Sequence, residues 1–136
     1  MKKTIVFAIL LFMSFKINAQ TFKEKKSTYY INILINKNKE VRIESDLVQF
    51  KNLDKEIKKR IYNRPFKLDE NVTYRVFADE NLLLGYIMDV EEKLFAGYSS
   101  YTTNRKRYLL DTGEMQIDGP EWTKRLKELK FDIEKG

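Results

Sequence analysis

The chain has 136 residues, of which 43% are hydrophobic, 34% are charged and 13% are aromatic. This is the length of one domain, and disordered chains contain fewer aromatic residues. The chain contains no cysteine and no histidine. It therefore cannot form disulfides or thiolate metal sites, and it lacks the commonest general base. Because no nucleophile motif is present either, we expect no catalytic residues, no cofactor and no metal site.

The formal net charge of +6 is concentrated in part at the N-terminus. Residues 1–19 carry three lysines and no acid, so the remaining chain has 23 basic against 20 acidic side chains. Basic and acidic residues alternate along most of the chain, whereas a nucleic-acid-binding domain would show a basic face. We therefore expect no nucleic-acid partner.

Residues 1–19 have the pattern of a secretory signal peptide. A basic start is followed by an apolar run at residues 4–15 and by Ala19, a small residue suited to the cleavage site before Gln20. The alternative is an inner-membrane anchor through uncleaved residues 4–15, although a spanning helix needs about 20 apolar residues. We expect export to the periplasm, with residues 20–28 as a polar lead-in.

Hydrophobic alternation predicts two strands at the start of the domain. Residues 29–35 and residues 41–43 each place apolar side chains on one face, and the polar turn between them indicates a hairpin. A helix is expected from Leu53, with Asn52 as its cap and Pro65 as the residue that ends it.

A strand followed by a helix is predicted next. Residues 72–78 alternate as a third strand, and we expect Asp79 to be the structural cap of the following helix. Gly97 stands where a C-terminal cap would lie. The predicted apolar stripe of this helix consists of Leu83, Leu84, Ile87, Met88, Val90, Leu94 and Phe95. Residues 98–103 (YSSYTT) are predicted as a fourth strand.

The last third of the chain is predicted to contain a short strand and a helix. We expect a turn at residues 104–107 and a fifth strand at residues 108–110, followed by a turn-rich segment. Pro120 is suited to the first turn of a helix. The amphipathic stripe of that helix consists of Trp122, Leu126, Leu129 and Ile133.

This order of elements predicts the α+β class. We expect a two-layer domain with a ββαβαβ(β) sheet that is mixed or antiparallel, helices on one face, and a C-terminal amphipathic helix. The domain is placed at residues 29–110, and the tail with the amphipathic helix is placed at residues 111–136.

The stretch from residue 30 to residue 101 resembles the periplasmic domain of the ExbD/TolR family of biopolymer transport proteins. The similarity is carried by YINILINKNKEVRIES, LDKEIKKRIY and YRVFADENLLLGYIMDVEEKLFAGY. The family has a strand that ends in Ala-Asp, a helix with a Met-Asp pair, and a glycine where that helix ends. The matching positions here are Ala78-Asp79, Met88-Asp89 and Gly97.

The resemblance implies a binding module of a TonB- or Tol-type proton-driven energy-transduction system. Family members carry a proton-transferring Asp in or beside a membrane-spanning helix, whereas no carboxylate precedes Glu24 here. We therefore expect an accessory without the proton-carrying segment. The partners that the resemblance implies are ExbB/TolQ-like, TonB-like or other envelope proteins, peptidoglycan and a second copy of the chain. The alternative is a stand-alone exported structural or cell-wall-associated protein that reuses the fold.

The expected partner site is an open edge strand and the basic segment after it, because an open edge can accept a strand from another chain. The predicted partner-binding residues are Tyr98, Tyr101, Thr103, Arg105, Arg107 and Tyr108. A second basic patch lies near Tyr62 and Arg64, and it is read either as a site for an anionic partner or as a solvated surface. Asp89, Glu91 and Glu92 are expected on a solvated face.

Overall fold

The computed structural model describes residues 27–65 and 70–131. Within these ranges, five strands form one sheet in the order β3-β2-β1-β4-β5. The strands are β1 (Thr28–Ile35), β2 (Val41–Ile43), β3 (Asp46–Val48), β4 (Asn71–Asp79) and β5 (Asn104–Leu110). The helices are the one-turn η1 (Phe50–Asn52), α2 (Leu53–Tyr62), α3 (Leu84–Gly97) and α4 (Trp122–Glu128).

The sheet is mixed. β1, β2 and β3 are antiparallel neighbours, whereas β4 is parallel to β1 and β5 is parallel to β4. Parallel neighbours need crossover connections, and α2 and α3 lie in the connections that lead into β4 and β5. β4 is therefore the strand that joins the N-terminal hairpin to the C-terminal half of the domain.

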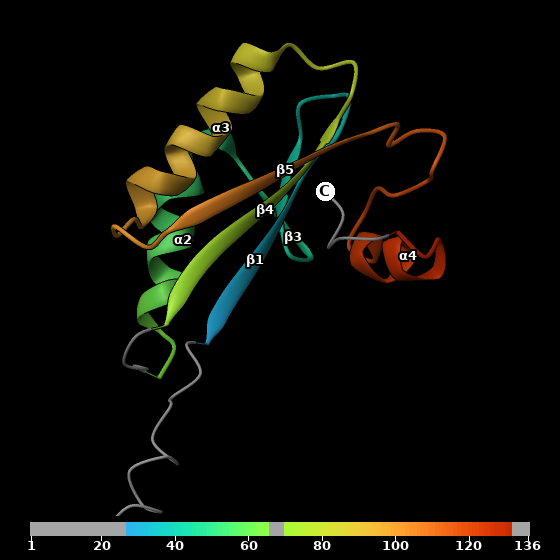
Figure 1. The fold of residues 1–136 in the computed structure, drawn as a ribbon. Coiled ribbons are helices and arrows are strands. Elements are labelled where there is room, and N and C mark those ends of the chain that lie inside the picture. The colour runs from blue at the N-terminus through green and yellow to red at the C-terminus, as the bar shows by residue number, and fades with distance from the viewer. Residues whose placement is uncertain (1–26, 66–69, 132–136) are drawn as a thin grey trace, which may run out of the picture.

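Helices α2 and α3 cover one face of the sheet (Figure 1). The alternating apolar residues of β1 and β4 point toward them, so that Ile33 and Val76 are completely buried. Buried Tyr74 donates a hydrogen bond to the carbonyl oxygen of Tyr98 at 2.7 Å, at the end of α3. The larger core of the protein therefore lies between β1, β4 and these two helices.

Helix α4 packs on the opposite face of the sheet (Figure 1). Its Trp122 is completely buried, and its ring meets the edge of the Phe77 ring with centroids 5.3 Å apart. Phe77 also stacks on Tyr108 at 4.7 Å. The members of this second core are Leu34, Phe77, Tyr108, Leu110, Ile117, Trp122 and Leu126. Strand β4 has apolar side chains on both of its faces, and helices cover each face.

The α+β class predicted from the sequence is confirmed, and the helices at the predicted central positions lie on one face of the sheet. The predicted strand at residues 98–103 is wrong. The hydroxyl groups of Ser100 and Thr103 bind nearby backbone, with the Ser100 N–H donating to Thr103 Oγ1 at 2.8 Å, and this closes a turn. The strand begins at Asn104 instead, so the predicted turn at residues 104–107 is wrong too. Strand β3 was not predicted.

No helix in residues 27–65 and 70–131 is long and apolar enough to cross a membrane. The predicted signal peptide or anchor at residues 1–19 lies outside the described residues, as does most of the lead-in.

Gly97 marks a close approach between α3 and α2. A Cβ atom at this position would lie 2.5 Å from the Asp54 carbonyl oxygen and 2.8 Å from Ile57 Cβ. We expect Gly97→Ala to lower the free energy of unfolding by about 1–3 kcal/mol, because the two helices must separate. Gly85→Ala is the matched control, since nothing lies within 4 Å of its Cβ, and it should be neutral or stabilising by up to about 1 kcal/mol. Urea unfolding measures both, and equal effects would contradict this packing.

Candidate partner-binding site

β5 is an edge strand within the described part of the chain. It pairs with β4 over its whole length, from Asn104 to Leu110, and no described strand lies on its outer side. An edge strand presents a row of unpaired backbone N–H and C=O groups. The predicted edge strand at residues 98–103 is therefore wrong, and the open edge belongs to β5 instead.

The arginines of β5 are held by a buried carboxylate of α3. Glu91 is only 1% exposed, and it accepts hydrogen bonds from Arg107 Nε at 2.6 Å, from Arg107 Nη2 at 2.5 Å, and from Arg105 Nη1. The hydrogen bonds that Arg107 donates to Glu91 raise the pKa of the Arg107 guanidinium above its ordinary value, despite the opposing effect of burial. These arginines therefore clamp β5 to α3. Arg107 is largely committed to this carboxylate, whereas the side chain of Arg105 remains 45% exposed.

The other predicted partner-binding residues take different roles. Tyr108 is only 4% exposed and belongs to the core beneath α4, so it is not available to a partner. Tyr98 follows α3 and receives the hydrogen bond of Tyr74, while Thr103 closes the turn before β5. Tyr101 alone is fully exposed, at the tip of that turn.

The structure exposes several apolar residues near this edge, including two that the sequence placed on the apolar stripe of α3, Leu84 and Met88. Leu109 is 55% exposed, and on a strand it shares the α3-facing side with Arg107. Met88 and Leu84 are about half exposed, and they lie on the same stripe of α3 as Glu91. Helix α3 connects the parallel strands β4 and β5, so it runs in the opposite direction to both. Glu91, in the middle of α3, reaches Arg107, and the first turns of α3 therefore lie toward the C-terminal end of β5. We call this apolar group and the open side of β5 the edge surface.

The acidic residues of α3 that were predicted to share a solvated face differ in their exposure. Asp89 and Glu92 are exposed, as expected, whereas Glu91 faces the sheet. A helix places residues 91 and 92 about 100° apart, which separates neighbouring acids onto different faces. The described residues contain no group of three or more acidic side chains that could hold a metal ion.

Asp79 does not cap α3, so this prediction is wrong. The chain makes a turn after β4, α3 begins at Leu84, and the preceding Leu83 occupies the cap position. The Asp79 carboxylate instead accepts hydrogen bonds from the Thr112 hydroxyl at 2.5 Å, the Thr112 N–H at 3.1 Å and the Asn81 N–H at 3.0 Å. It therefore ties the end of β4 to the loop that follows β5.

The hydrogen bonds of Asp79 keep it ionised although it is buried. Burial opposes ionisation, but the donors from Thr112 and Asn81 outweigh it and hold the pKa of Asp79 below its ordinary value. A carboxylate with a lowered pKa stabilises the fold above the pKa of the unfolded chain, about 3.9, and this contribution is lost as the pH falls through the lower folded value.

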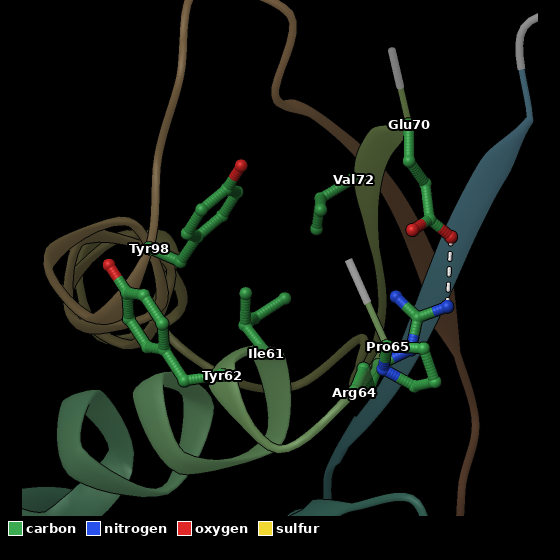
Figure 2. Close-up of a pocket in the computed structure, with 7 residues that line it drawn as sticks. All are labelled: Ile61, Tyr62, Arg64, Pro65, Glu70, Val72 and Tyr98. Carbon is green, nitrogen blue, oxygen red and sulfur yellow. Dashed lines mark hydrogen bonds and ion pairs between the residues drawn. The ribbon is translucent and has the colours of Figure 1, made fainter. Parts of the chain in front are cut away.

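A hollow of about 250 Å³ lies where the end of α2 approaches β4 and α3 (Figure 2). Tyr62 and Tyr98 stand on one side of it, and Tyr62 is 69% exposed. On the other side, Arg64 pairs with Glu70 at 2.8 Å, and its guanidinium lies over the Tyr29 ring. The basic patch predicted at Arg64 is therefore partly neutralised, and the exposed ring of Tyr62 is the distinctive feature.

A comparison of the chain with known protein families, curated proteins and solved structures finds no match.

We expect Asp79→Asn to lower the free energy of unfolding at pH 7 by about 1–3 kcal/mol, because a buried hydrogen-bonded carboxylate is lost. The difference from the wild-type protein should shrink as the pH is lowered from 7 to below 3, since the wild-type carboxylate then becomes protonated. Urea unfolding at a series of pH values measures this. Glu80→Gln is the control, because Glu80 is exposed and should show no such difference. A difference that is independent of pH for Asp79→Asn would contradict the assignment.

Proposed function

We propose that the chain is an exported, ExbD/TolR-like binding module that serves as an accessory of a TonB- or Tol-type energy-transduction system. The observation that carries the proposal is the edge surface, where β5 has an open side next to exposed Leu84, Met88 and Leu109. Such an edge is suited to an extended segment of an envelope protein.

Strand addition would use backbone and side chains together. Main-chain hydrogen bonds to the edge give affinity, and contacts to alternate side chains of the added segment give specificity. Strand β5 has seven residues, which is a typical length for a strand in a globular protein. The clamp between Glu91 and Arg107 holds the strand in place, so less ordering is needed when a segment binds.

The resemblance to the ExbD/TolR family supports this proposed function. Ala78 and Asp79 are the last two residues of β4, Met88 and Asp89 lie in the first half of α3, and Gly97 is the last residue of α3. These positions suit a strand that ends in Ala-Asp, a helix with Met-Asp and a glycine at the helix end.

Photocrosslinking in cells tests the proposal. A photoreactive residue at Asn104 or at Leu109 should capture a TonB-, Tol- or ExbB-like protein, identified by mass spectrometry, whereas the same residue at exposed Lys124 of α4 should not. The double variant Leu109→Glu, Met88→Glu should lower the yield at Asn104 several-fold, because charges replace exposed apolar contacts without entering either core. Capture of only a second copy of the chain would indicate a homodimer, and no envelope partner at any edge position would refute the proposal.

A second candidate function, attachment to the cell wall, is favoured by the hollow in Figure 2. Tyrosine rings present flat apolar faces with a polar tip, which suits contact with the glycan strands of peptidoglycan. Tyr62 and Tyr98 line that hollow beside the paired Arg64 and Glu70. This candidate corresponds to the stand-alone exported protein considered from the sequence.

Retention on purified peptidoglycan distinguishes the two functions. If the hollow binds glycan, Tyr62→Ala should reduce retention several-fold, while Tyr62→Phe should preserve most of it because the ring remains. Tyr101→Ala is a matched control, since Tyr101 is fully exposed and lies outside the hollow. Retention that is unchanged in Tyr62→Ala would exclude the hollow as the glycan site.

A further inference from the structure

The backbone groups that β5 turns outward can be assigned to particular residues. The Glu80 N–H donates to the Leu110 carbonyl oxygen at 2.8 Å, so the backbone groups of Leu110 point toward β4. Along a strand, the N–H and C=O of one residue point to the same side, and this side alternates from residue to residue. The backbone groups of Arg105, Arg107 and Leu109 therefore point away from the sheet. An added strand would form its hydrogen bonds at these three residues.

The same three residues place their side chains on the α3 side of the sheet. Arg105 and Arg107 both reach Glu91 of α3, and Leu109 follows at the next alternate position. Leu109 is more than half exposed, and exposed Met88 of α3 belongs to the same apolar group of the edge surface. Along β5 the open edge thus changes from cationic at its start to apolar at its end.

Arg105 is the cation that a partner can reach. Arg107 donates two hydrogen bonds to Glu91 and its side chain is 25% exposed, whereas Arg105 donates one and is 45% exposed. Glu91 carries one negative charge, so two arginines on one carboxylate leave an excess of positive charge. Glu92, the exposed acid beside Glu91, makes no ion pair with a described arginine of β5. The start of the edge is therefore suited to a further carboxylate.

A second copy of the chain is not complementary to this edge. Antiparallel pairing of two β5 strands over their full length would place the two Arg107 side chains opposite each other, and Arg105 opposite Leu109. Like charges directly opposite each other destabilise a pair of strands. The complementary segment instead carries an acidic side chain at the cationic end and an apolar side chain at the end of Leu109.

We propose that the edge surface binds an extended segment of another protein in which an apolar residue is followed, four positions later, by an acidic residue. The segment runs antiparallel to β5, the orientation that is slightly more stable per residue. Its apolar residue therefore comes first, opposite Leu109 and in contact with Met88 and Leu84, and its acidic residue lies opposite Arg105. This inference rests on the proposed function, whose edge it uses, and it adds the chemistry of the bound segment.

Short peptides test this order of side chains. The full chain is titrated with a dye-labelled peptide, capped at both ends, that carries a leucine and, four residues later, a glutamate among threonines and serines. Fluorescence anisotropy should show saturable binding with a Kd on the order of 0.1–1 mM. Replacing the glutamate by glutamine should weaken binding about two- to fivefold, as expected for one exposed ion pair across two strands.

Two further peptides test the apolar end and the direction. Replacing the leucine by serine should weaken binding several-fold, because the contact with Leu109 and Met88 is lost. A peptide of the same composition with the glutamate first and the leucine second should also bind several-fold more weakly. Equal or tighter binding of this reversed peptide, or of the glutamine peptide, would overturn the proposal, and so would the absence of saturable binding by any peptide.

Variants assign each preference to its residue. Arg105→Gln should abolish the preference for glutamate over glutamine, whereas Lys124→Gln, which removes an exposed charge from α4, should preserve it. Met88→Gln should reduce the preference for leucine over serine. Leu47→Gln should not, since Leu47 is equally exposed but lies on β3 at the opposite edge of the sheet. Each result is a ratio of two affinities on one variant, so a general loss of binding does not affect it. An unchanged preference in Arg105→Gln would refute the role of Arg105.

Amide hydrogen exchange, followed by NMR, tests the pairing itself. The first peptide, at a free concentration of about ten times its Kd, should slow exchange of the outward N–H groups of Arg107 and Leu109 by up to about tenfold. The N–H of Leu47 on the opposite edge should exchange as before. Binding without slower exchange at β5 would overturn strand addition at this edge.

This inference and the proposed function fail separately. Capture of an envelope protein at Asn104 through a segment that lacks the apolar and acidic pair would refute the inference and retain the function. Peptides that bind in the expected order, without capture of any envelope protein in cells, would refute the function and retain the chemistry of the segment.

Discussion

The structure depends on the burial of β4 on both of its faces. Seven of the nine residues of this strand are buried, and neighbouring residues serve different cores. Val76 points to the core beneath α2 and α3, while Phe77 points to the core beneath α4. A fully buried large apolar side chain contributes about 1.5–3 kcal/mol, so the strand cannot remain in place if either helical layer is lost.

Two buried carboxylates hold the C-terminal half of the domain to this strand and its helix. Glu91 of α3 binds Arg105 and Arg107 of β5, and Asp79 of β4 binds Thr112 just after β5. Both carboxylates are only 1% exposed, and each is compensated by several donors. The outermost strand is thereby anchored through side chains as well as through its backbone pairing with β4. This anchoring holds the edge strand in place on both its backbone and its side-chain contacts.

The same arrangement leaves two kinds of surface on opposite sides of the sheet. On the α3 side, the apolar residues Met88 and Leu109 stand beside the open edge of β5. On the α4 side, the short helix leaves Arg75 partly exposed, and Arg75 Nε has no hydrogen-bond partner among the described residues. One surface offers backbone and apolar contacts, and the other offers a partly exposed arginine. They therefore differ in the ligands that they suit.

The sequence by itself determined the α+β class and the main strands and helices. Apolar residues that repeat every second residue indicate a strand, and apolar residues that repeat every three or four residues indicate a helix, with one face toward a core. Only the tertiary structure decided that residues 98–103 form a turn, that Glu91 is buried while Leu84 and Met88 are half exposed, and that Asp79 binds Thr112, 33 residues later in the chain. Local periodicity tells which residues share a face. It cannot tell how far a neighbouring element covers that face, because coverage depends on contacts between segments that are distant in the sequence.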